Sequence, residues 1–201
     1  MTARLETFAD GVFAIAATLL ILNVDGQVSE DVHDLGGRLV HIWPSYLAYA
    51  ASFVTIGIMW INHHTIMSQV ERVDRRFLIA NIGLLLCIAF FPFTTRLVAE
   101  HVRGGGAMAA ALTYGFTGVA TASMFNITWF YAAVGKRLLR RDAEPAVVSG
   151  ITRTYIPGPW IYLTATLVAF ASPVVSIVLF GTIALLYVLE SSLFGGTRSL
   201  D

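Results

Sequence analysis

Long apolar segments alternate with short polar ones along the 201-residue chain. A helix needs about 20 mostly apolar residues to cross the hydrocarbon core of a bilayer. The apolar stretches are Phe8–Val24, His41–Met67, Phe77–Val98, Ala107–Val134 and Tyr155–Leu193. The last stretch is too long for one span, and Ser172-Pro173 interrupts it, where proline supplies no backbone donor. The pattern therefore predicts an all-α integral membrane protein with six transmembrane helices in one domain, residues 1–201.

Composition supports a membrane class. Apolar residues make up 56% of the chain and charged residues 13%, against about 25% charged residues in soluble domains. A soluble domain of this size could not hide so much apolar surface from water. Lysine plus arginine equals aspartate plus glutamate, at 13 each, so the bulk charge indicates no nucleic-acid partner.

The distribution of basic residues predicts the orientation of the helices. With six spans, both termini and the even-numbered connections lie on one side. That side holds Arg4, Arg72, Arg75, Arg76, Lys136, Arg137, Arg140, Arg141, Arg153 and Arg198, and the other side holds Arg38, Arg96 and Arg103. Cytoplasmic loops carry the excess of lysine and arginine in membrane proteins. We therefore expect both termini to be cytoplasmic.

The first apolar segment has two distinct faces. At 100° per residue, a narrow apolar stripe forms from Gly11, Ile15, Leu19 and Leu22, with Thr18 on its flank. Asp10 lies on nearly the opposite side from Ile15. A carboxylate inside a membrane is costly and normally faces protein or a water-filled cavity. We therefore expect Asp10 to face neighbouring helices rather than the stripe.

Polar residues of the second and third segments fall at the depth of Asp10. They are Trp60, Asn62, His63, His64 and Asn81. Hydrogen bonds between such residues fasten membrane helices together, and we favour this structural interpretation. The alternative is that Asp10 and a histidine form a proton relay or gate.

Metal binding and catalysis have little support. Adjacent histidines point about 100° apart on a helix, so His63 and His64 do not share a ligand geometry, and no cysteine or further histidine joins them at metal-ligand spacing. Neither a G-x-S-x-G nor an H-E-x-x-H motif occurs, and Cys87 has no evident base. We expect no metal site, no cofactor and no enzyme activity.

Motifs in the first three segments resemble a known family. They are Arg4 with Phe8-Ala9-Asp10-Gly11-Val12-Phe13-Ala14-Ile15-Ala16-Ala17-Thr18-Leu19-Leu20, then Trp60-Ile61-Asn62-His63-His64, then Asn81, then Phe91-Pro92-Phe93-Thr94-Thr95. Together they resemble the endosomal/lysosomal potassium channel family, transmembrane protein 175, in its prokaryotic single-repeat branch. One position departs, because the family usually has serine where this chain has Ala9. The absence of that hydroxyl removes one potential hydrogen bond from the polar residues at this depth.

The resemblance implies a homotetrameric cation channel whose pore is lined by the first helix of each subunit. The hydrophobic constriction of the family maps onto Ile15, with further layers at Leu19 and Leu22, and its selectivity layer maps onto Thr18. The chain has no pore loop and no T-V-G-Y-G filter. The expected function is passive flux of potassium ions with modest selectivity, in the plasma membrane of a prokaryote. The alternative is a proton-permeable channel or proton-coupled transporter that uses Asp10 and His63 or His64.

Overall fold

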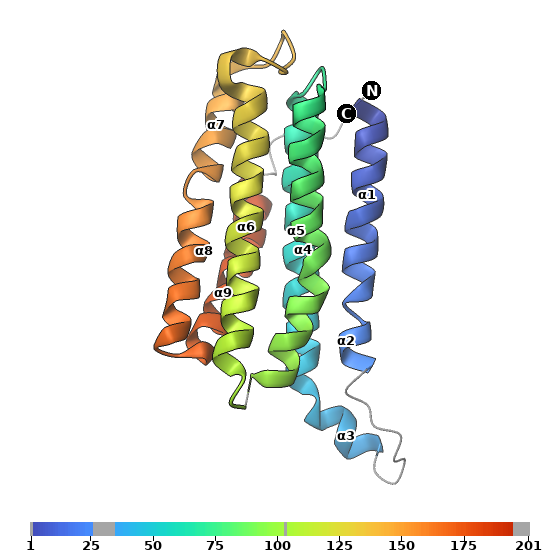
Figure 1. Cartoon of the computed structure of the whole chain (residues 1–201), viewed down its shortest axis with the longest axis vertical. Coiled ribbons are helices and arrows are strands. Elements are labelled where there is room, and N and C mark those ends of the chain that lie inside the picture. Colours follow the sequence, from blue (N-terminus) through green and yellow to red (C-terminus); the bar gives the residue numbers. More distant parts are fainter. Residues whose placement is uncertain (1, 26–34, 103, 195–201) are drawn as a thin grey trace.

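The computed structural model describes residues 2–25, 35–102 and 104–194, and this part of the chain is all-helical. The long helices lie side by side in one bundle (Figure 1). In chain order the elements are α1 (Thr2–Leu19), α2 (Leu22–Asp25), α3 (Leu35–His41), α4 (Trp43–Gln69), α5 (Arg75–His101), α6 (Ala107–Ala133), η2 (Val134–Lys136), α7 (Pro145–Tyr155), α8 (Gly158–Leu167), η3 (Val168–Phe170) and α9 (Pro173–Phe194). The predicted all-α class is confirmed for these residues.

The second, third and fourth apolar segments are each one unbroken helix of 27 residues, α4, α5 and α6. Polar residues continue α5 beyond its apolar run at both ends and α4 at its C-terminal end. Helix α6 agrees with the predicted Ala107–Val134 to within one residue. Among the described residues, three helical stretches are long and apolar enough to cross a membrane. They are Thr2–Val24, Trp43–Gln69 and Arg75–His101.

The first apolar segment is helical but not continuous. Helix α1 ends at Leu19, and α2 begins at Leu22. Between them the backbone N–H groups of Ile21, Asn23 and Val24 donate to carbonyls three residues earlier, at 3.0 to 3.3 Å. This bonding pattern belongs to the tighter 3₁₀ geometry. The prediction of one helix to Val24 therefore missed a tight turn near its C-terminal end.

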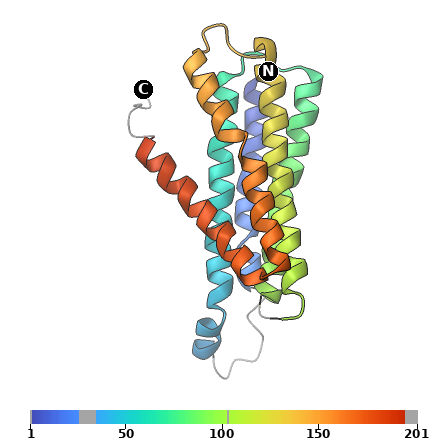
Figure 2. The ribbon, with the colours of Figure 1, turned by 90° about the vertical axis from the view of Figure 1, so that its left-hand side faces the viewer.

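The prediction that the fifth helix begins at Tyr155 is wrong. Helix α7 already begins at Pro145 and ends at Tyr155, and α8 continues in nearly the same direction from Gly158 (Figure 1). Helix α7 is amphipathic, so an average over its residues hides its apolar face. The predicted break at Ser172-Pro173 is confirmed, since α9 begins at Pro173 and crosses the other helices obliquely (Figure 2).

Helix α6 lies in the most closely packed part of the bundle, against α5 on one side and α8 on the other. Small residues allow this approach. A Cβ atom added at Gly118 would lie 2.7 Å from Cδ1 of Tyr162, and one added at Gly115 would collide with Thr166 and lie 2.8 Å from Cζ of Phe180. Close backbone approach through small residues is the usual way in which helices associate in membranes.

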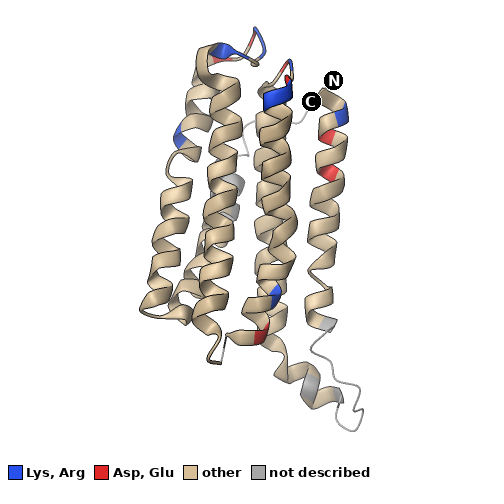
Figure 3. Cartoon of the chain, in the orientation of Figure 1, with Lys and Arg blue, Asp and Glu red and all other residues tan. Residues whose placement is uncertain are grey.

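The charged residues gather at one end of the bundle. Most lysine and arginine positions lie at the end where α1 and α5 begin (Figure 3). Helix α6 ends there at Ala133, and Gly135 has a φ of 66°, a conformation that glycine adopts without a steric penalty. Arg103 and Arg198, which the charge pattern assigned to opposite sides, lie outside the described residues. We call the end where α5 begins the inner end, and the opposite end the outer end.

Candidate functional site

The predicted apolar stripe of the first helix is exposed on the single chain. Ile15 is 60% exposed, Leu19 43% and Leu22 59%. The opposite face of α1 packs against α4 and α5, and its buried residues are Leu5, Ala9, Phe13 and Ala16. A row of large apolar side chains thus faces away from the bundle, where another chain, lipid or a pore must lie.

Thr18 lies between two layers of the stripe and is exposed. Its hydroxyl lies 2.9 Å from the carbonyl oxygen of Ala14 and 3.0 Å from that of Ile15. A hydroxyl has one hydrogen and two lone pairs. Because the hydrogen is directed to the backbone of α1, the oxygen of Thr18 turns its lone pairs away from the helix. The side chain can therefore offer oxygen contacts to a cation on the exposed face.

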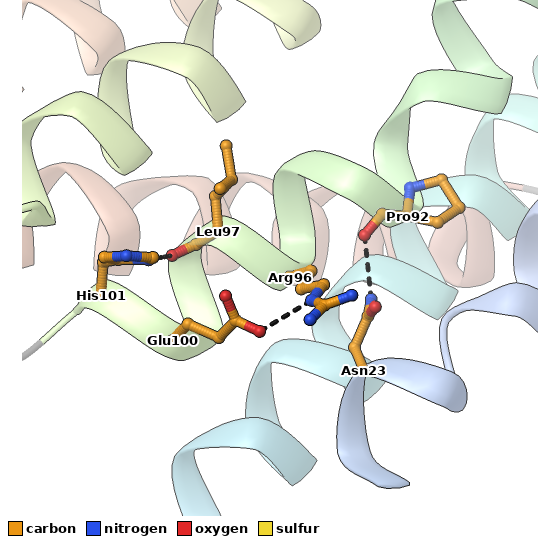
Figure 4. Close-up of polar contacts among 6 residues, drawn as sticks. All are labelled: Asn23, Pro92, Arg96, Leu97, Glu100 and His101. Atoms are coloured by element: carbon orange, nitrogen blue, oxygen red, sulfur yellow. Dashed lines mark hydrogen bonds and ion pairs between the residues drawn. The ribbon is translucent and has the colours of Figure 1, made fainter. Parts of the chain in front are cut away.

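The outer end of the first helix is tied to α5. Nδ2 of Asn23 in α2 donates to the carbonyl oxygen of Pro92, at 2.9 Å. Pro92 lies inside α5. In the next turn of α5 the guanidinium of Arg96 pairs with Glu100 at 2.7 Å (Figure 4). Asn23 was not predicted as a site residue. The only sequence signal was a polar residue at the end of an apolar run.

Asp10 contacts the second long helix. Nε1 of Trp60 in α4 donates to Oδ1 of Asp10 at 2.8 Å, and the Trp60 ring stacks with His64 at a centroid distance of 6.3 Å. All three side chains are exposed on the single chain. The carboxylate of Asp10 therefore lies off the apolar stripe, as its position on the helix predicts. It nevertheless remains exposed to solvent or lipid on the single chain.

His63 and Asn81 form a separate, buried contact. Nε2 of His63 and Oδ1 of Asn81 are 2.9 Å apart, and both side chains are at most 2% exposed. With the amide oxygen as acceptor, Nε2 carries the proton of the imidazole. The Phe13 ring lies 5.5 Å from the His63 ring and joins α1 to this contact. Within the described part of the chain, Nδ2 of Asn81 has no hydrogen-bond partner.

Asn62 does not join these residues as expected. Its main-chain carbonyl oxygen accepts a hydrogen bond from the hydroxyl of Tyr155 at 3.0 Å, which links α4 to the end of α7. The predicted polar layer therefore divides into separate contacts. Asp10–Trp60 and His63–Asn81 lie on the side of α1, and Asn62–Tyr155 lies on the side of α7. The tyrosine was missed because the fifth helix was expected to begin there.

Another hydroxyl network lies nearer the outer end. The Thr95 hydroxyl donates to Oγ of Ser52 at 2.8 Å, and Oγ of Ser52 lies 3.4 Å from the Tyr114 hydroxyl. These residues join α4, α5 and α6 and are buried. Thr95 belongs to a motif that carries the family resemblance, but its partners lie on other helices and leave no local signal in the sequence.

The inner end of α5 has an ionised N-cap. Oδ1 of Asp74 accepts from the backbone N–H of Phe77 at 2.9 Å, and Oδ2 accepts from the Tyr131 hydroxyl at 2.7 Å. The hydrogen bond from Phe77, then that from Tyr131, lowers the pKa of the Asp74 carboxyl, and the nearby Arg137 acts in the same direction. This cap joins α5 to α6 at the bundle end that bears most of the charge.

The residues that the structure describes contain no group of three or more histidine, cysteine, aspartate or glutamate side chains that could hold a metal ion.

The family model described as endosomal/lysosomal potassium channel TMEM175 matches residues 4–92. A potassium channel of Chamaesiphon minutus is 40% identical to this chain over 193 residues, which cover 95% of each protein. This chain belongs to the TMEM175 family. The crystal structure of a lysosomal potassium-selective channel TMEM175 homolog from Chamaesiphon minutus superimposes with a TM-score of 0.84 at 38% identity, covering 94% of this chain and 97% of the other.

A more distant TMEM175 relative carries a different description. The endosomal/lysosomal proton channel TMEM175 of Danio rerio is 33% identical over 139 residues, which cover 65% of this chain and 27% of the fish protein. Membership of the TMEM175 family makes this chain a multi-pass membrane protein of an ion-channel family, not of an enzyme family.

Proposed function

We propose that four copies of this chain form a cation channel that lets potassium ions pass down their gradient, with modest preference over sodium. The exposed apolar stripe of α1 and α2 carries this proposal. One chain cannot enclose a pore with a single helix, whereas a ring of copies places the same face of each helix around one axis. The potassium-channel names of the bacterial relatives support the choice of ion.

In the proposed pore, the ring of Ile15 side chains is the narrowest point, and Leu19 and Leu22 extend the apolar wall outward. A narrow apolar neck excludes water and so closes a channel without a plug. Opening requires the neck to widen through a tilt or rotation of α1. The exposed Thr18 hydroxyls then supply oxygen contacts to a partly dehydrated cation. Side-chain hydroxyls form a looser filter than a ring of backbone carbonyls, which is why we expect modest selectivity.

The proposed arrangement crosses the membrane six times, with the inner end in the cytoplasm of a prokaryotic cell. The crossings are α1 with α2, α4, α5, α6, α7 with α8, and α9. Helices of 27 residues are about 40 Å long at 1.5 Å per residue, enough for the hydrocarbon core and part of both headgroup layers. The excess of basic residues at the inner end favours a cytoplasmic location for it.

Reversal potentials of the purified protein in planar bilayers test the proposal. With potassium on one side and sodium on the other, we expect a reversal potential displaced towards that of potassium, but by less than a strictly selective pore would give. Thr18→Val removes the oxygen and keeps the shape, so it should bring the reversal potential closer to zero. Absence of cation current under all gradients and voltages would refute the channel.

One observation favours the proton pathway as a second candidate function. Asp10, Trp60 and His64 form a continuous contact on the exposed side of the chain, and the fish relative is described as a proton channel. Asp10→Asn removes the titratable group but keeps an acceptor for Trp60. If the contact only fastens helices, proton flux into liposomes loaded with a pH-sensitive dye should not change. Selective loss of proton flux in a folded variant would favour the relay.

A further inference from the structure

Two connections at the inner end are held together by their backbones. The N–H of Glu71 donates to the carbonyl of Leu138 at 2.9 Å, and the N–H of Arg140 donates to the carbonyl of Gln69, also at 2.9 Å. Val70 and Leu139 form an isolated antiparallel bridge, and their side chains are buried. The connection between α4 and α5 and the connection after α6 therefore form one fixed surface, although some 70 residues separate them in sequence.

This surface has an excess of positive charge. Residues 70–76 and 134–144 together contain seven basic and four acidic side chains. We call the exposed basic residues the basic rim: Arg72, Arg75, Arg76, Lys136, Arg137, Arg140 and Arg141. Asp74 lies 3.8 Å from Arg137, and Asp142 lies 3.1 Å from Arg140. In the described part of the chain, the other five rim residues have no ion-pair partner.

In the membrane placement proposed above, the basic rim lies at the height of the lipid phosphates. Helices α4, α5 and α6 are each about 40 Å long, whereas the hydrocarbon core is about 30 Å thick. Their ends therefore lie in the headgroup layer, and the rim comes directly after those ends. Arg75 and Arg76 also occupy the first turn of α5, where the N-terminal backbone dipoles add to the positive potential.

We propose that the basic rim binds the phosphate groups of anionic phospholipids in the leaflet at the inner end. Clusters of four to eight lysine and arginine residues beside a transmembrane helix attract anionic lipid. Here the two connections are fixed to each other, so the charges do not have to be ordered on binding. The inference rests on the membrane placement given under Proposed function, but not on ion conduction.

Lipid retention by the purified full-length protein tests the inference. The protein in neutral detergent is mixed with phosphatidylglycerol or phosphatidylcholine, and bound lipid is counted by native mass spectrometry. We expect the wild type to retain phosphatidylglycerol preferentially. The variant R72Q/R75Q/R76Q should lose about tenfold or more of that preference, because each basic residue near an anionic lipid contributes independently.

The matched control removes the three arginines that the charge pattern assigns to the outer side, as R38Q/R96Q/R103Q, of which Arg38 lies in α3 and Arg96 in α5. It should retain phosphatidylglycerol like the wild type. Equal losses in the two variants, or no loss in the first, would overturn the inference. The wild type is also measured at increasing sodium chloride, where screening should weaken retention. The salt series needs no variant, so it tests the inference even if R72Q/R75Q/R76Q does not fold. Phosphatidylglycerol retention that does not change with salt would contradict headgroup binding.

Competition with inorganic phosphate distinguishes a lipid ligand of the basic rim from a soluble anion. Millimolar phosphate should displace little phosphatidylglycerol, because the lipid also contacts the helices through its acyl chains. Complete displacement by phosphate would assign the rim to a free anion and overturn the lipid proposal. Because these readouts count bound lipid, failure of the inference is distinguishable from failure of the proposed channel, which is read as current.

Discussion

Helix α1 leaves the large apolar side chains of Ile15 and Leu19 exposed on the single chain, whereas α6 buries small residues such as Gly115 and Gly118 against α8 and α9. Helix α6 is therefore stabilised within its own subunit. The exposed apolar face of α1 must instead contact other copies of the chain, lipid or the contents of a pore. The contrast separates a helix whose packing stabilises the subunit from a helix whose exposed face lines the pore in the proposed channel. Variants of the two helices should thus affect different measurements.

The largest expected effect is a loss of stability in α6. Gly115→Ala places a methyl group against Thr166 and Phe180, and such overpacking costs about 1–3 kcal/mol of the free energy of unfolding. The thermal unfolding midpoint in detergent should fall. Gly11→Ala is the matched control in α1, where an added Cβ meets nothing within 4 Å. Helix propensity favours alanine over glycine by about 1 kcal/mol, so this midpoint should not fall. Equal destabilisation would refute the contrast.

The next effect concerns conduction. Ile15→Ala shortens the side chains at the proposed neck, so water should enter it more easily and the closed channel should leak. Single-channel recordings should show a several-fold rise in conductance or in basal open time, with little change in the unfolding midpoint. Ile127→Ala is the control, because Ile127 is also exposed but lies on α6. If Ile15→Ala changes stability but not current, the stripe is a packing surface.

A smaller effect on stability is expected when acid protonates Asp74 at the inner end of α5. The pKa of the Asp74 carboxyl is lowered in the folded protein, against an ordinary value of about 3.9. The carboxylate therefore adds stability that is fully present above the ordinary value, and that is lost as the pH falls through the lowered value. The difference in unfolding midpoint between the wild type and Asp74→Asn should therefore stay constant from pH 6 down to the ordinary value and begin to shrink towards about pH 3. A difference that does not shrink in acid contradicts this assignment.

The smallest effect comes from two matching asparagines. Nδ2 of Asn23 donates to the carbonyl of Pro92, and Nδ2 of Asn126 donates to that of Tyr155 at 2.8 Å. Nδ2 of Asn126 also donates to the carbonyl of Ala122 in its own helix, at 3.0 Å. Leucine therefore removes one bond between helices at each site, a net change of about 1 kcal/mol per neutral hydrogen bond, and at Asn126 one further bond within α6. Asn126→Leu should lower the unfolding midpoint, whereas Asn23→Leu should chiefly alter open and closed times, because it frees α2 from α5. The reverse assignment would contradict the division between the two helices.

Helical periodicity in the sequence predicts which side of a helix each residue faces, because this depends on that helix alone. The positions of Ile15, Leu19 and Asp10 around α1 follow from the helical repeat, and the structure places them on the faces expected. The partners of Asn23, Asn62 and Thr95 depend on how distant helices pack, which a single sequence does not encode locally. The early start of α7 was missed for a different reason, because hydropathy averaged over an amphipathic helix resembles that of a loop.

The tight turn between α1 and α2 has a consequence for the electric field in the proposed pore. Ile15 and Leu22 are seven residues apart, about 10.5 Å at the α-helical rise, and the 3₁₀ geometry adds about 1 Å. Voltage falls mainly where mobile water and ions are absent. In the proposed pore it would fall over this neck rather than over about 30 Å of hydrocarbon. The field across Thr18 would then be roughly three times as steep as in the surrounding lipid.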